Sequence, residues 1–141
     1  MKKINTNNSM TLMQMMQEDT SEEVHALAMK GVQVAMFTTI SIQYHLDENE
    51  LAAIIGLPLS TLHYYKEQKK LIVGRPAEHL LKLANLFAIG IIIFRNATEF
   101  NKWLLHPFKL SKVIAKDYLQ TISGINILIE ELHAIGVGYP V

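Results

Sequence analysis

The stretch that decides the fold is Asp47-Glu-Asn-Glu-Leu-Ala-Ala-Ile-Ile-Gly-Leu-Pro-Leu-Ser-Thr-Leu62. Asp47 and Glu50 have the spacing of a capping box, which predicts that a short helix begins there and runs to Ile55. Gly56 can take the positive φ of a tight turn, so the helix is expected to end at this residue.

A second helix is expected after Pro58, capped by Ser60 or Thr61 and running to about Lys70. Ala52 supplies a small side chain where two crossing helices approach most closely. The apolar frame that would hold the pair together consists of Leu51, Ile55, Leu57, Leu62 and Tyr65. These features together favour a helix-turn-helix over the alternative, which is two ordinary core helices with a chance glycine.

The second helix would expose a polar and basic face. The hydroxyl, imidazole and phenol groups at its start could reach phosphates or base edges, while the lysines would position the DNA backbone. Four basic residues stand against Glu67 between Ser60 and Arg75. The alternative is a solvated charged helix end. The candidate DNA contacts are Ser60, Thr61, His63, Tyr64, Lys66, Lys69, Lys70 and Arg75.

Outside this unit, apolar residues recur at spacings of three and four, which favours an all-α fold. A helix is expected to begin at Ser21 and to stop before Gly31, and a second apolar segment, 32–46, is also expected to be helical. Pro76 suits the first position of a long helix running to about Arg95. That helix is apolar almost all round beyond Leu86, so it should be buried in the fold or in an oligomer interface.

Three shorter helices are expected in the C-terminal third. Thr98 could cap the first, which carries Trp103. The second would cover 112–122 and be broken by Ser123-Gly124, and the third would cover 125–135. The remaining glycines and proline predict a short extended tail. We therefore expect a flexible Met-rich or loosely docked arm at 1–20, a helix-turn-helix domain at 21–76 and a small helical domain with a tail at 77–141.

Composition bounds the class of protein. The chain has 141 residues, of which 50% are hydrophobic and 18% charged, which excludes intrinsic disorder of the whole chain. It has no cysteine, so disulfides and thiolate metal sites are excluded. The first 20 residues lack the apolar core of a secretory signal, and the unbroken apolar run 86–94 is too short to span a bilayer. A cytoplasmic protein without membrane contact is expected.

No feature of the sequence indicates catalysis. The six histidines form no metal-ligand pair with nearby carboxylates, and neither a phosphate-cradling glycine loop nor a nucleophile elbow occurs. We therefore expect no enzyme activity, no catalytic residues, no metal site and no cofactor. The 13 basic residues cancel the 13 acidic ones, which argues against a protein that simply coats nucleic acid.

From about residue 30 to the end, the chain resembles the antitoxins of RES-type toxin–antitoxin pairs, the Xre/MbcA/ParS group. The order and spacing of several short segments carry the resemblance, and no single one of them decides it. These segments are Leu51 to Leu62, Leu71 with Leu80-Leu-Lys-Leu-Ala84, Ile93-Phe94 with Trp103-Leu104, Asp117-Tyr-Leu-Gln-Thr121 with Gly124, and Leu128-Ile-Glu-Glu-Leu132 with Ile135 and Gly138.

The resemblance implies a Cro/Xre-like helix-turn-helix domain followed by a helical toxin-binding domain. The implied partners are a RES-domain toxin that consumes NAD⁺ and operator DNA, and the chain would be a homodimer within a larger complex. Inhibition would be occlusion of the toxin's active site, with the C-terminal tail nearest its mouth. The implied toxin-binding residues are Trp103, Glu130, His133, Gly136, Gly138 and Tyr139.

Two segments depart from the family pattern. Tyr64 and Tyr65 stand where paired arginines are common, which lowers the expected attraction to phosphates. Residues 111–115 replace a Gly-Gly-x-x-Pro-like entry to the penultimate helix, so the preceding loop can take another course. Ordinary core packing of Trp103 and a disordered C-terminus are the plain alternatives to the toxin-binding roles. The alternative function is a stand-alone Xre-like repressor with a C-terminal dimerisation domain.

Overall fold

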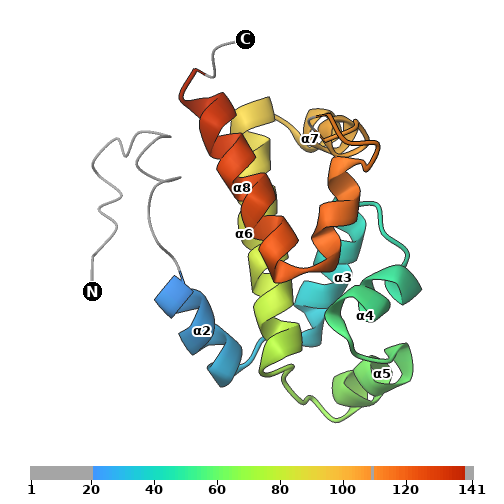
Figure 1. Cartoon of the computed structure of the whole chain (residues 1–141). Helices are drawn as coiled ribbons and strands as arrows, with labels where there is room; N and C mark the ends of the chain where they lie inside the picture. The colour runs from blue at the N-terminus through green and yellow to red at the C-terminus, as the bar shows by residue number, and fades with distance from the viewer. Residues whose placement is uncertain (1–20, 109, 139–141) are drawn as a thin grey trace.

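The computed structural model describes residues 21–108 and 110–138, and this part of the chain is all helical (Figure 1). The Met-rich arm and Tyr139 lie outside the described residues. Two isolated antiparallel bridges, Val32 with Ile72 and Pro107 with Ile114, pair short segments between helices. The elements are α2 (Ser21–Lys30), α3 (Val34–Gln43), α4 (Glu48–Ile55), α5 (Leu59–Glu67), α6 (Arg75–Phe94), α7 (Ala97–Leu104), the 3-10 helix η1 (Ala115–Gln120) and α8 (Ile122–Gly136).

Helix α6 is the axis of the fold. Helices α2, α3, α4, α7 and α8 all pack against it, and α8 lies alongside it in Figure 1. By length and composition α6 could cross a membrane, a property that the core helix of a soluble protein shares. The unbroken apolar run 86–94 is too short to span a bilayer, but the apolar helix to which it belongs is 20 residues long. The side chains that it buries are Ala77, His79, Leu80, Leu83, Leu86, Phe87 and Ile89.

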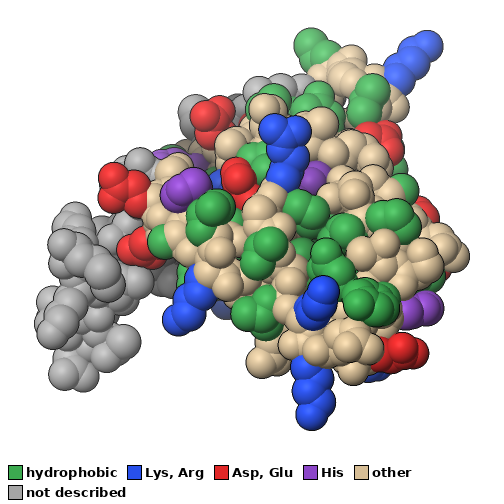
Figure 2. Space-filling view, turned by 90° about the horizontal axis from the view of Figure 1, so that it is seen from below, with side chains coloured by type: hydrophobic (Ala, Val, Ile, Leu, Met, Phe, Trp, Pro, Cys, Tyr) green, Lys and Arg blue, Asp and Glu red, His purple; other side chains and the backbone are tan. Residues whose placement is uncertain are grey.

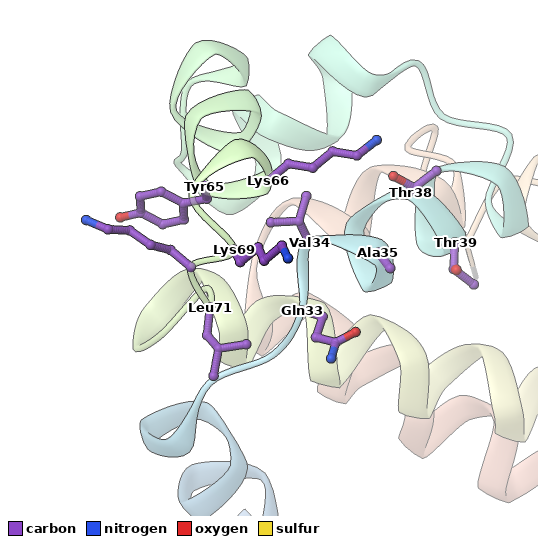
Figure 3. A pocket seen from close by; sticks show the side chains of 10 residues that line it. Gln33, Val34, Ala35, Thr38, Thr39, Tyr65, Lys66, Lys69 and Leu71 are labelled. Atoms are coloured by element: carbon purple, nitrogen blue, oxygen red, sulfur yellow. The ribbon is translucent and has the colours of Figure 1, made fainter.

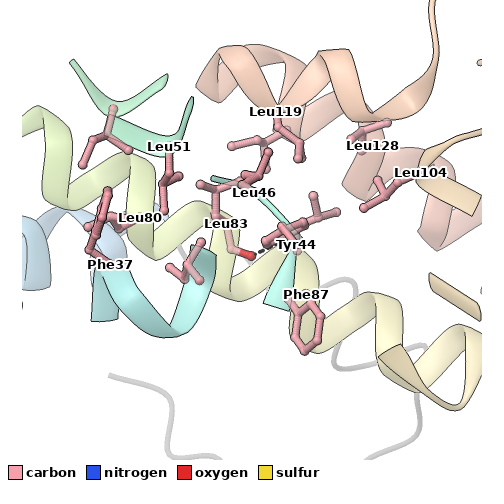
Figure 4. Close-up of a cluster of buried hydrophobic side chains, with 14 of the residues drawn as sticks. Phe37, Tyr44, Leu46, Leu51, Leu80, Leu83, Phe87, Leu104, Leu119 and Leu128 are labelled. Carbon is pink, nitrogen blue, oxygen red and sulfur yellow. Dashed lines mark hydrogen bonds between the residues drawn. The ribbon is translucent and has the colours of Figure 1, made fainter. Parts of the chain in front are cut away.

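A tyrosine joins the first half of the chain to α6. Tyr44, which follows α3, is fully buried, and its hydroxyl donates a hydrogen bond of 2.6 Å to the carbonyl of Leu83 (Figure 4). Its ring meets Phe87 edge-on at 5.6 Å between centroids, and Phe100 of α7 at 6.1 Å. Burial raises the pKa of the phenol well above its ordinary value, so the hydroxyl keeps its proton for this bond.

Helix α7 is held near Tyr44 by one hydrogen bond to the end of α3 and by close packing on α6. The buried Asn101 amide donates to the carbonyl of Gln43 at 2.9 Å, which satisfies an acceptor at the end of α3. Phe100 packs so closely on Gly90 that a Cβ there would lie 2.5 Å from the ring. The sequence gives no pattern for this contact because it joins residues on two helices at a bend of the chain.

One hydrophobic cluster extends from Ala28 to Leu132 and includes residues from both predicted domains. Figure 4 shows Leu51 of α4, Leu80 of α6 and Leu128 of α8 in the same group of side chains. The hydrophobic cluster around α6 therefore includes residues on both sides of the domain boundary expected between residues 76 and 77. The two-domain division stays a prediction of the sequence.

Several expected helix ends are confirmed. Helix α2 covers Ser21–Lys30, and Gly31 follows it with a φ of 110°. The capping box opens α4, where the Asn49 amide donates to Asp47 Oδ1 and the Asp47 amide donates to Glu50 Oε1, both at 3.2 Å. The long helix α6 also forms, with Pro76 as its second residue.

Two of the expected caps were wrong. Pro58, and not Ser60 or Thr61, precedes α5, so these two hydroxyls lie in the first turn. Asn96, and not Thr98, caps α7, because its side chain accepts from the Glu99 amide at 2.8 Å. Pro58 makes no side-chain cap bond, whereas Asn96 and Thr98 are both capping residue types, and only the backbone path decides between those two.

The C-terminal helices also differ from expectation. The segment expected as a helix over 112–122 is mostly the 3-10 helix η1. Ser123-Gly124 does not interrupt the helical structure, because both residues lie inside α8. Thr121 ends this segment instead, and its hydroxyl oxygen accepts from the Gly124 amide at 2.9 Å to begin α8. Gly124 is buried inside α8 against the Tyr118 carbonyl, where no Cβ would fit. This glycine serves close packing, and sequence alone reads such a glycine as a break.

A buried histidine ties α6 to η1. The Nε2–H of His79 donates to the Leu119 carbonyl at 2.8 Å, since a carbonyl can only accept. Burial lowers the pKa of His79, while the bond to Leu119 and the nearby Glu78 carboxylate oppose that shift. The neutral ring is therefore the form that suits the folded chain.

Replacing Tyr44 by Phe should lower the free energy of unfolding by about 1–2 kcal/mol, because it removes a buried hydrogen bond and keeps the ring. Urea denaturation followed by circular dichroism measures the difference. Tyr64→Phe is the control, since Tyr64 is 50% exposed, and should leave the stability nearly unchanged. Equal stability of the two variants would contradict the role given to Tyr44.

Stability should also fall in acid because of His79. Its pKa is lower in the folded chain than in the unfolded one, so the unfolded state binds the proton more readily. The contribution of His79 is complete above the unfolded pKa of about 6.5 and is lost as the pH falls through the folded value. Denaturation midpoints measured between about pH 7 and pH 5 should decrease less for His79→Gln than for the parent. Parallel curves would contradict this assignment.

Candidate nucleic-acid interface and partner surface

Helices α4 and α5 form the predicted helix-turn-helix. Gly56 joins them in the left-handed conformation, with φ 75° and ψ 29°, and the Leu57 amide donates to the Ala52 carbonyl at 3.1 Å. Ala52 is buried at the approach of the two helices, as its size predicts. Of the predicted apolar frame, Leu51, Ile55 and Leu62 are buried, and Leu57 and Tyr65 are partly buried.

Helix α5 presents the predicted polar residues to solvent. Ser60, His63, Tyr64 and Lys66 are exposed, whereas Thr61 is partly buried. The helix packs against α3 and α4, at the edge of the fold in Figure 1. This position leaves the outer side of α5 free to meet a large partner such as DNA.

The turn after α5 determines the positions of Lys69 and Lys70. The helix ends at Glu67, three residues before the expected end, and Lys69 has a φ of 54°. The Lys70 amide then donates back to the Tyr65 carbonyl at 2.8 Å. This left-handed turn directs Lys70 over the ring of Tyr64, with 5.3 Å from Nζ to the centroid. The termination was missed because a lysine stands where a glycine is the usual signal.

The three lysines Lys66, Lys69 and Lys70 line one groove, the lysine groove, of 610 Å³ between α5 and α3 (Figure 3). Across the groove from the lysines lie Thr38 and Thr39 of α3, both exposed. Sequence reasoning missed this side of the site, because nothing in the sequence shows that α3 lies beside the end of α5. The other residues that line the groove are Gln33, Val34, Ala35, Tyr65 and Leu71.

On the face that Figure 2 shows, the basic side chains do not form a continuous patch. Figure 2 shows Lys and Arg side chains that project separately, with hydrophobic and acidic side chains between them. Arg75 is exposed at the start of α6 and is not among the residues lining the lysine groove, and Glu67 is exposed on α5 itself. Local attraction for phosphates therefore comes from a few separate lysines, consistent with the neutral sequence.

The described residues expected to bind a toxin lie on α7, on α8 and just after α8. Trp103 is partly buried and stacks with Phe100 at 6.0 Å and with Phe94 at 5.6 Å between centroids. Glu130 and His133 lie one turn apart on α8, followed by Gly136 at its end. Gly138 is exposed with a φ of 80°.

Sequence reasoning also missed an exposed apolar loop between α7 and η1. The Phe108 amide donates to the Val113 carbonyl at 2.8 Å, and the Ala115 amide donates to the His106 carbonyl at 3.1 Å, which closes the loop. Leu110 is fully exposed in this loop. Leu105 and Val113 are 59% and 45% exposed beside it, so three apolar side chains face solvent here. Exposed apolar groups that gather in one place are typical of a protein–protein contact.

Within the described ranges, no three histidine, aspartate or glutamate side chains lie together as a metal site would require. Comparison with family models gives one finding, a match of residues 23–87 to the antitoxin Xre-like helix-turn-helix domain. The match begins in α2 and ends within α6, so it contains α3, α4 and α5 entirely. Comparison with curated proteins finds no match. The geometry shows a helix-turn-helix at α4 and α5, and the match makes residues 23–87 similar to an antitoxin Xre-like helix-turn-helix domain, which supports an Xre-type antitoxin and DNA-binding regulator.

Proposed function

We propose that the chain is the antitoxin of a type II toxin–antitoxin pair, that it neutralises a RES-domain toxin, and that it binds operator DNA to regulate its own operon. The observation that carries the proposal is the family match over the helix-turn-helix. The order of motifs in the C-terminal half, which resembles the Xre/MbcA/ParS group, supports the RES-type partner. Both activities belong in the cytoplasm, and the chain needs no catalytic residue for either.

For DNA, the proposal assigns base contacts to the start of α5 and backbone contacts to its end. Ser60, His63 and Tyr64 are the exposed groups that can reach base edges in a major groove. Lys66, Lys69 and Lys70 neutralise phosphates beside them. With three lysines in the lysine groove of each chain, affinity depends on two chains that bind two half-sites together, which favours a homodimer on DNA.

For the toxin, the proposal assigns inhibition to the C-terminal part of the chain. The end of α8 and the residues that follow it, with Gly136 and Gly138, would lie over the mouth of the toxin's active site. The apolar residues of the 105–113 loop supply surface that a partner could bury. The buried core of α8 ends at Leu132, so residues after Ile135 can be removed without opening the core.

The lysine groove is tested by replacing Lys66, Lys69 and Lys70 together with alanine. The variant should bind operator DNA more weakly, and the slope of log K against log salt should decrease by about 0.9 for each lost phosphate contact. Fluorescence anisotropy over a salt series measures both. A matched control replaces Lys102, Lys112 and Lys116, which removes the same charge from the C-terminal part of the chain. Equal slopes for the two variants would exclude the lysine groove from the interface.

Inhibition is tested by truncation after Ile135. The shortened chain should keep its operator affinity and should fail to rescue cells that express the cognate toxin. A stand-alone repressor with a C-terminal dimerisation domain would show no toxin-dependent phenotype at all. Rescue by the truncated chain would exclude occlusion by the tail, and circular dichroism confirms that it remains folded.

A further inference from the structure

Helix α3 forms the wall of the lysine groove that faces the lysines, although it precedes the helix-turn-helix in the chain. Its exposed residues recur at spacings of three and four, so they lie on one face of the helix. They are Ala35, Thr38, Thr39 and Ile42. The first three line the groove, whereas Phe37 and Ile40 of the same helix are buried in the core. The outward face of α3 therefore continues the exposed surface of α5.

The groove has the chemistry of an anion site. None of the ten residues that line it is acidic, and three of them are lysines. Figure 3 shows Lys66 extending across the groove toward Thr38, and Lys69 directed toward the first turn of α3. Ammonium groups from one side of the groove therefore face hydroxyl groups from the other. Lysine binds phosphate oxygens through its charge, and threonine does so through a hydrogen bond from its hydroxyl.

The groove suits a strand of DNA better than a small free anion. Its volume of 610 Å³ leaves room for a sugar beside its phosphates. Val34, Ala35 and Leu71 contribute apolar surface on which a deoxyribose can pack. Lys66 belongs to the last turn of α5, and the backbone of a duplex passes beside a recognition helix that lies in its major groove. A phosphate bound here would belong to the same duplex that α5 reads.

We propose that the backbone of one DNA strand lies in the lysine groove, where the Thr38 and Thr39 hydroxyls donate hydrogen bonds to the phosphates that Lys66 and Lys69 neutralise. This inference rests on the DNA binding proposed above and adds α3 as a contacting helix. Because Tyr44 joins the end of α3 to α6, phosphates held from both sides of the groove fix the orientation of the DNA relative to the core. The threonines position the duplex and read no bases.

The threonines are tested by combining Thr38→Val with Thr39→Val, which removes both hydroxyls and keeps branched side chains on an exposed helix face. Binding is measured by fluorescence anisotropy with a duplex that carries the promoter of the chain's own operon. The affinity should fall about tenfold, as expected when hydrogen bonds to a charged group are lost. The slope of log K against log salt should stay at the parent value, because no cation is removed.

Thr98→Val is the matched control, since Thr98 is exposed on α7 and does not line the groove. It should bind the duplex as the parent does, and circular dichroism confirms that both variants are folded. Parental affinity of the double threonine variant would overturn the inference. A salt slope reduced as in the triple lysine variant would also overturn it, because the threonines would then act only by placing the lysines.

Ethylation interference on the same duplex shows whether the threonines and the lysines share a phosphate. Ethylation removes the charge of a phosphate and adds bulk, so it weakens binding wherever the parent makes a contact. The double threonine variant and Lys66→Ala should both reduce this interference at the same phosphates and keep it elsewhere. Reduction at different phosphates would overturn the inference and leave the proposed DNA binding intact. A parent chain that does not bind the promoter duplex would overturn both proposals.

Discussion

The hydroxyl of Tyr44 is buried in a mainly apolar core and donates its hydrogen bond to the Leu83 carbonyl. An unpaired buried hydroxyl costs about 1–3 kcal/mol, so this bond is a condition of burying the ring. Because the bond joins the end of α3 to the middle of α6, it fixes how deep and at what angle the two helices meet. Phe87 and Phe100 then pack against the same ring and against each other, with their own centroids 5.9 Å apart.

The position of α6 in turn decides where the functional surfaces lie. Helix α5 is held through α3 and α4 at the edge of the fold, which leaves its outer side exposed. The bond from Asn101 to Gln43 holds α7, and with it Trp103, at the end of α3. The DNA-facing helix and the C-terminal part of the chain are therefore attached to one rigid core, although they would serve different partners.

The exposed surface differs in how its charged and its apolar side chains are distributed. The chain is neutral overall and only three lysines line the lysine groove, so the proposed DNA binding would be weak for a single copy and would depend on more than one copy. The apolar surface is more concentrated, in the 105–113 loop and in the groove between α3 and α6.

The sequence by itself determined the all-α class, the helix-turn-helix, the end of α2 before Gly31 and both ends of α4, because these depend on local signals such as the capping box at Asp47 and the left-handed turn at Gly56. Only the tertiary structure decided the course of η1 and α8, since Gly124 looks like a break until Tyr118 is seen against it. It also decided the site, because Thr38 and Lys66 are 28 positions apart and share a groove only when α3 packs beside α5. Local propensity acts over one turn of chain, whereas close approach between helices depends on the shape of the whole core.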